Sequence, residues 1–136
     1  RGSVSSWTRK LLANEGNNYT SNAFDDDLPY HDSSGLIVVP YNLDTNDMKF
    51  FHPNGFVRSA EMYEYVCDAV EQLLIEARAG KSSTLSIGFH LRIGGRPARF
   101  RAVTKILEYL ADLDAQIWRA RRIDIARHFA AVSQTA

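Results

Sequence analysis

His90 is the residue of this sequence with the clearest capacity for chemistry. It directly follows a run in which Leu85, Ile87 and Phe89 alternate with small residues, as they do in a buried β-strand. An imidazole titrates near neutral pH, so a histidine held at a strand end can pass a proton to a departing nitrogen atom. The same position also suits a histidine that only hydrogen-bonds to the backbone, and both interpretations stay open at this point.

Further polar residues follow the predicted strands at equivalent positions. Ligands of parallel α/β folds bind at the carboxyl ends of the strands, where such side chains converge. Arginines in this set can hold a carboxylate or a ureide carbonyl group through two hydrogen bonds. Arg99 and Arg101 fall on the following helix, where arginines more often pair with surface carboxylates. The residues that follow the strands are Asn42, Asp44, Asn46, Asp47, His90, Arg92, Arg96, Arg99 and Arg119.

The elements that would position these residues alternate between strand and helix, which is typical of parallel βαβ units. Ser59 suits an N-cap, Gly80 suits the end of that helix, and Pro97 suits the first turn of the next. The helix that begins at Pro97 is predicted to bury Phe100, Val103, Ile106, Leu107 and Leu110. Strands are predicted over 35–41, 83–89 and 115–118, and helices over 59–78, from 97 and from 123, with a weaker helix over 8–14 and a weaker strand over 19–24.

Composition excludes several classes of function. Sixteen basic and sixteen acidic residues cancel, so neither nucleic acid nor a membrane is an expected partner. No apolar run reaches the ~20 residues that span a bilayer, and Cys67 has no second cysteine to pair with. His31, His52 and His128 lack the spacing of a metal motif, so no metal site is expected from this chain alone. The compartment cannot be read from the sequence, although the cytoplasm is favoured.

The chain is too short to close a barrel. Its 136 residues hold three or four strand–helix units, whereas an eight-stranded barrel takes about 250 residues. It also begins at Arg1 without a methionine, which suggests a fragment. The expected fold is therefore α/β, either an open sheet or a partial (β/α) barrel in which parallel strands alternate with helices.

An acidic run, Asp25 to Asp27, precedes Leu28, Pro29 and Tyr30. Such a run is usually a solvated loop. The proline and tyrosine that follow it favour a more defined turn.

Four segments, in this order and spacing, resemble the polysaccharide deacetylase superfamily, in particular its allantoinase and chitin-deacetylase-like branch. The similarity runs from Arg1 to about Phe129 and predicts that residues 1–136 are the C-terminal part of one catalytic domain, a distorted (β/α) barrel. The segments are Phe24–Tyr30, Leu36–Tyr41 with Asp44–Asp47, Gly88–His90 with Gly95–Arg99, and Trp118–His128.

The resemblance implies roles for particular residues. His90 corresponds to a histidine at the end of a late strand, and Arg1 to an arginine ahead of a Ser-x-x-Thr stretch; both are candidate catalytic residues. The catalytic aspartate base, and a divalent metal where one is used, would belong to the N-terminal half. The residues expected to line the substrate are Asp26, Asp27, Pro29, Tyr30, Asn46 and Asp47, with Arg96 added for its carboxylate-binding chemistry.

The chain departs from this branch at two places. Tyr19–Asn22 reads Tyr-Thr-Ser-Asn where the branch usually has Tyr-Asp-Ser-Asp, and His31 stands where an aromatic residue is common. These differences put the substrate in question.

Three functions follow as hypotheses. The first is hydrolysis of carbon–nitrogen bonds in a cyclic amide or ureide such as allantoin, with His90 as the acid. The second is N-deacetylation of a polysaccharide such as chitin. The third is an inactive fragment, or a pairing module that completes a barrel with another chain, and a homo-oligomer is compatible with the sequence.

Overall fold

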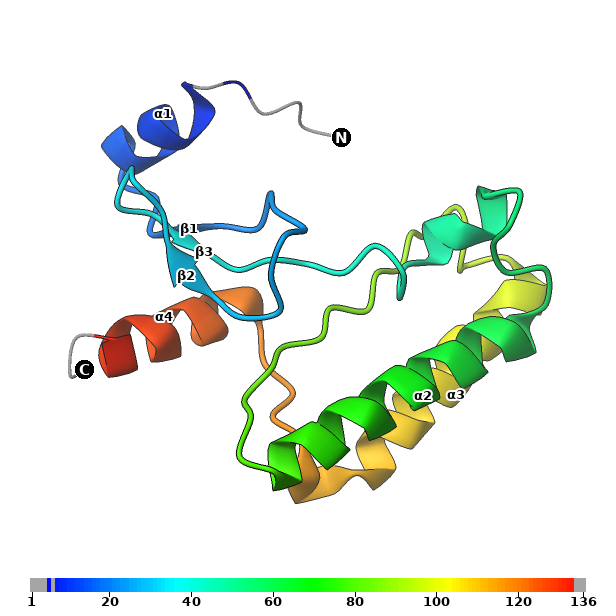
Figure 1. Ribbon diagram of the computed structural model, residues 1–136. Helices are drawn as coiled ribbons and strands as arrows, with labels where there is room; N and C mark the ends of the chain where they lie inside the picture. The colour runs from blue at the N-terminus through cyan, green and yellow to red at the C-terminus, as the bar shows by residue number, and fades with distance from the viewer. Residues whose placement is uncertain (1–4, 6, 134–136) are drawn as a thin grey trace. The chain divides into compact units, whose positions relative to one another are not determined.

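The computed structural model describes residues 5 and 7–133, which divide into two compact units. The sheet unit comprises Arg1–Tyr41 and Arg119–Ala136, and the helix unit comprises Asn42–Trp118. Figure 1 shows the elements of each unit. Organisation as the C-terminal part of one domain stays a prediction.

Three short strands form the sheet unit's sheet. β1 (Tyr19–Thr20) pairs in parallel with β3 (Ile37–Val38), and β2 (Tyr30–His31) pairs with β3 in the antiparallel direction. The central strand β3 is buried, as its apolar sequence predicts. Antiparallel β2 departs from the predicted parallel arrangement because a tight turn returns the chain directly to β3. In that turn the Asp32 carboxylate accepts hydrogen bonds from the backbone N–H groups of Ser34 and Leu36.

Two helices complete the sheet unit, and both are predicted by the sequence. α1 (Thr8–Asn14) precedes the sheet, and α4 (Arg122–Ser133) packs against β3. The contact with α4 is apolar: Ile37 and Val39 form a buried cluster with Ala126. The unit is therefore mixed α/β with a small three-stranded sheet, and a partial barrel stays a prediction.

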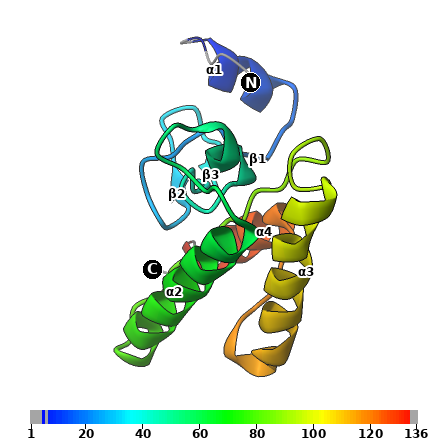
Figure 2. The same cartoon turned by 90° about the vertical axis from the view of Figure 1, so that its right-hand side faces the viewer.

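Two long helices dominate the helix unit. α2 (Ser59–Arg78) and α3 (Pro97–Asp112) lie side by side and begin at the same end of the unit, because the extended connection between them runs back (Figure 1, Figure 2). The bounds of α2 and the start of α3 match the sequence prediction, although the cap of α2 differs. Ser59 is the first helical residue, and the Glu61 carboxylate accepts the backbone N–H groups of Val57 and Arg58 instead.

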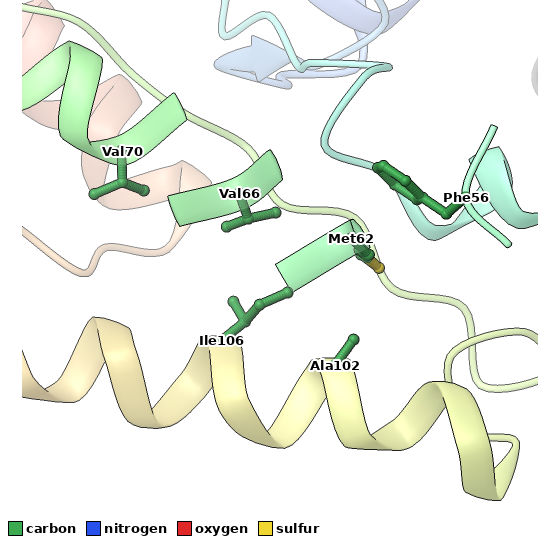
Figure 3. Close-up of a cluster of buried hydrophobic side chains, with 6 residues drawn as sticks. All are labelled: Phe56, Met62, Val66, Val70, Ala102 and Ile106. Atoms are coloured by element: carbon green, nitrogen blue, oxygen red, sulfur yellow. The ribbon is translucent and has the colours of Figure 1, made fainter. Parts of the chain in front are cut away.

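The core of the helix unit lies between α2 and α3 (Figure 3). Met62 and Val66 of α2 face Ala102 and Ile106 of α3, and all four side chains are fully buried. The predicted buried face of α3 is wrong in part, since Phe100 and Leu107 are 53% and 57% exposed. The neighbouring helix α2 covers the face of α3 that carries Ala102 and Ile106, so Phe100 and Leu107 outside that face stay exposed. The small side chain of Ala102 leaves room for α2 on that face.

Ile106→Ala is expected to lower the free energy of unfolding by about 2–5 kcal/mol, because it opens a cavity among fully buried neighbours. Leu107→Ala is the matched control, since it removes the same kind of group from an exposed position of the same helix. The control is expected to cost less than about 0.5 kcal/mol. Urea denaturation followed by circular dichroism measures both, and equal losses would contradict this packing.

Two predicted strands are wrong. Residues 83–89 are extended, but within the described part of the chain they make a single bridge, between Gly88 and Asn46, because side chains take the place of a neighbouring strand. The Ser86 N–H donates to Asn42 Oδ1 at 2.9 Å, and the Ser86 carbonyl accepts from Thr45 Oγ1 at 2.7 Å. Residues 114–116 form a 3-10 turn, η2 (Asp114–Gln116), at whose start Asp114 takes a positive φ of 41°.

Candidate catalytic site

The candidate site begins with Asp47, the first residue of a 3-10 helix, η1 (Asp47–Phe51). Asn46 caps this helix, since its side-chain oxygen accepts the Met48 N–H at 2.9 Å. The Asp47 N–H donates to the Gly88 carbonyl at 3.0 Å. This backbone bond joins the start of η1 to the segment that ends at His90.

The Asp47 carboxylate is fully buried and holds the His90 loop. Its Oδ2 accepts the backbone N–H groups of His90 at 2.7 Å and Gly94 at 2.9 Å. Its Oδ1 lies 2.6 Å from Nδ1 of the His90 ring. Because a carboxylate can only accept, Nδ1 is the donor of this bond. The buried carboxylate thus fixes both the backbone and the ring of His90.

The other edge of the His90 ring is open. The His90 side chain is 41% exposed, whereas that of Asp47 is 0% exposed. Among the residues that the structure describes, Nε2 has no hydrogen-bond partner. A histidine oriented by a carboxylate at one nitrogen and open at the other has the geometry of a general acid or base.

Two glycines allow the segments to come this close. A Cβ atom at Gly88 would collide with the Asn46 side-chain amide, and one at Gly94 would lie 2.8 Å from Asp47 Oδ2. Sequence reasoning missed the bond between Asp47 and His90, because it assigned Asp47 to the substrate region. The available signal was the pair of glycines on either side of His90, which marks close backbone approach.

The remaining candidate residues lie elsewhere. Arg96 is exposed just before α3 and has no hydrogen bond to His90, and Arg1 lies outside the described residues. The acidic run belongs to the sheet unit, where Asp25 to Asp27 are exposed and form a local turn around the Asp26 side chain. Asp26 Oδ1 accepts the backbone N–H groups of Asp27 and Leu28 at 2.7 and 3.0 Å.

Tyr30 follows this turn after the buried Pro29. The Tyr30 hydroxyl donates to the Asp25 carboxylate, 3.1 Å from each oxygen. Burial, together with the hydrogen bond and negative charge of Asp25, raises the pKa of Tyr30 above its usual value.

Among residues 5 and 7–133, no three His, Cys, Asp or Glu side chains lie together as a metal ion would require. Nor does any helix there combine the length and apolar character that crossing a bilayer demands.

Comparison with known proteins gives one curated relative and several solved structures. A protein of Schizosaccharomyces pombe (strain 972 / ATCC 24843), whose name assigns it to the polysaccharide deacetylases, is 35% identical over 83% of this chain and 39% of its own length. No protein-family model matches the chain.

Two solved structures are similar at higher identity. The crystal structure of Puue allantoinase has a TM-score of 0.82 and 40% identity, over 96% of this chain and 44% of that one. A structure named as a polysaccharide deacetylase from Pseudomonas aeruginosa PAO1 has a TM-score of 0.85 and 41% identity, over 96% and 45%. A third, from Mycobacterium smegmatis, shares the fold with a TM-score of 0.79 at 24% identity over 96% of this chain and 47% of that one.

The chain therefore spans less than half the length of the proteins it matches, which is consistent with the predicted C-terminal half. The matches include both kinds of protein that its sequence segments resemble. The resemblance of this chain to the polysaccharide deacetylase superfamily, including its allantoinase branch, is confirmed.

Proposed function

We propose that this chain is part of a hydrolase of non-peptide carbon–nitrogen bonds, and that His90 is its general acid. The observation that carries the proposal is the bond from His90 Nδ1 to the fully buried Asp47 carboxylate, beside an exposed ring edge. The relatives named as polysaccharide deacetylases and as an allantoinase support the same class of reaction.

In the proposed reaction, water adds to the amide carbon and gives a tetrahedral intermediate. The C–N bond then breaks, and a proton moves from His90 Nε2 to the departing nitrogen, which would otherwise leave as an unstable anion. The base that activates water is proposed to come from the N-terminal half, as does any divalent metal. Arg1 is proposed to orient that base.

Asp47 is proposed as a positioning residue. Its carboxylate stabilises the ring with hydrogen on Nδ1, so the Nε2 edge is presented for proton transfer. Asn46 and Arg96, which belong to the helix unit with His90, are proposed to line the substrate. For Asp26, Asp27, Pro29 and Tyr30 of the sheet unit, contact with the substrate stays a prediction from the family resemblance.

The substrate is proposed to be a cyclic amide or ureide of which allantoin is the type. An N-acetylated polysaccharide is the second candidate, because a structure named as a polysaccharide deacetylase is 41% identical to the chain.

The test is hydrolysis by the full-length protein of allantoin and of chitooligosaccharides, each with and without a chelator. Turnover of allantoin is the expected result. Turnover of chitooligosaccharides alone would replace the first candidate by the second, and turnover of neither would overturn the assignment to these two substrates.

A further inference from the structure

A second feature of the helix unit lies a short way along η1 from Asp47. The Arg99 guanidinium carbon is 4.9 Å from the ring centroid of Phe50 and 5.0 Å from that of Phe51. Phe51 is 62% exposed, and Arg99 is partly exposed. The guanidinium is thus held against two aromatic rings at the surface of the unit, an arrangement that favours a fixed orientation.

Arg99 has no anionic partner among the described residues. Arg9, Arg58 and Arg121 each lie within ion-pair distance of a carboxylate. The Arg99 guanidinium makes neither a hydrogen bond nor an ion pair with any described residue, so the surface pair expected for it is not found there. Its charge is permanent and its N–H donors form a fork that matches a carboxylate.

Lys49 offers an informative contrast on the same segment. Its ammonium lies 4.9 Å from the ring centroid of Tyr65. The Tyr65 hydroxyl donates to Asp44 Oδ2 at 3.2 Å, so a carboxylate is already bound to the ring that holds this cation. Arg99 is the better candidate for an external anion.

Two connections tie Arg99 to the candidate catalytic site. Phe51 is four residues after Asp47 in η1, a rise of roughly 8 Å at about 2 Å per residue. Arg99 itself is five residues after Gly94, whose N–H donates to the Asp47 carboxylate. Arg99 therefore contacts η1, which begins at Asp47, and lies on the helix that follows the loop that Asp47 binds.

We propose that Arg99 anchors a carboxylate of the substrate whose carbon–nitrogen bond is cleaved at His90. The preferred substrate is then a cyclic amide or ureide that carries a carboxylate, of which allantoin is an uncharged analogue, and this proposal rests on the proposed function. Stacking on Phe50 and Phe51 orients the guanidinium before the ligand arrives, so less side-chain freedom is lost on binding.

The test compares hydantoin-5-acetic acid with hydantoin-5-acetamide, which differ in charge and little in shape. Binding of each to the full-length protein is measured by calorimetry. The acid is expected to bind about tenfold more tightly, as a charge-assisted pair predicts. Arg99→Gln is expected to abolish this preference. Arg101→Gln, an exposed arginine of the same helix, is the matched control and is expected to retain it.

Arg99→Lys keeps the charge but not the fork, so it is expected to lower the preference without removing it. This variant serves if Arg99→Gln does not fold. Equal binding of acid and amide, no binding of the acid, or a preference that survives in Arg99→Gln would overturn the proposal.

Binding does not require turnover, so this result is separate from the test of hydrolysis. A protein without hydrolase activity that prefers the acid through Arg99 would support the anion site and count against the hydrolase. An active hydrolase that shows no preference for the acid would support the proposed function and count against the anion site at Arg99.

Discussion

Replacing His90 by alanine is expected to lower kcat of the full-length protein about 10²–10⁴-fold, the contribution typical of one general acid. Without the proton from Nε2, nitrogen must depart as an anion. KM is expected to change little, because the proton is transferred only in the transition state. Steady-state kinetics on the substrate identified by the hydrolysis assay measures both constants.

His52→Ala is the control for this substitution. His52 is exposed, and its Nδ1 accepts the backbone N–H of Asn54 at 3.2 Å, so its removal is expected to leave kcat unchanged. An amide with an electron-poor nitrophenyl group on nitrogen provides a second check, because that nitrogen leaves readily without a proton. His90→Ala is expected to lose much less rate on it. Near-normal turnover of the ordinary substrate by His90→Ala would refute the acid role.

Asp47→Asn is expected to lower kcat nearly as far as His90→Ala does. The asparagine oxygen can still accept the backbone N–H groups of His90 and Gly94, which leaves its NH₂ group facing His90 Nδ1. That NH₂ group favours a ring without hydrogen on Nδ1 and opposes the doubly protonated ring that an acid requires. A comparable change beside a catalytic histidine lowers kcat about 10⁴-fold in Ser-His-Asp enzymes.

The combination of the two substitutions separates this role from a general loss of structure. In the double variant, Asp47→Asn is expected to lower kcat little beyond the effect of His90→Ala alone, because both substitutions remove the same proton transfer. Asp44→Asn is the control on the same loop, because Asp44 is exposed and accepts only a surface hydrogen bond from Tyr65. Independent, multiplicative losses in the double variant would show that Asp47 does not act through His90.

Helices were the most predictable part of the fold. The bounds of α2 follow from local signals, namely apolar spacing and Gly80, whose φ of +85° suits a helix end. Pro97 likewise fixes the start of α3. The buried face of α3 was less predictable, because it depends on how many neighbours a helix has and not on its own sequence. Phe100 satisfies the helical period and is still exposed.

Strands were less predictable, because a strand needs a partner. In residues 83–89 large apolar and small side chains alternate as in a strand. The backbone N–H and C=O of Ser86 nevertheless bond to the side chains of Asn42 and Thr45 and not to a neighbouring strand. Residues 115–118 have the composition of a strand, but the chain turns at Asp114. β2 was missed because only two residues pair, at the end of a tight turn.

The sequence predicted where the candidate site lies, but not the hydrogen bond between Asp47 and His90. The rule that polar residues gather after strands brought Asp47 and His90 to the same region. Their direct contact joins residues 43 positions apart and depends on the exact path of the loop around Gly94. Neither composition nor periodicity encodes that path. The contact of the Arg99 guanidinium with the rings of Phe50 and Phe51 likewise joins two separate elements, α3 and η1, so the sequence of neither element predicts it.

The hydrogen bonds that side chains make with the backbone of Ser86 have a consequence for solubility. Extended segments with unoccupied N–H and C=O groups are templates on which another chain can add as an intermolecular strand. The Ser86 N–H donates to Asn42 Oδ1 and the Ser86 C=O accepts from the Thr45 hydroxyl, in the middle of an extended segment that also carries Leu85, Ile87 and Phe89. These two side chains are therefore expected to keep the Ser86 backbone from pairing with a strand of another chain, and their loss is expected to favour self-association.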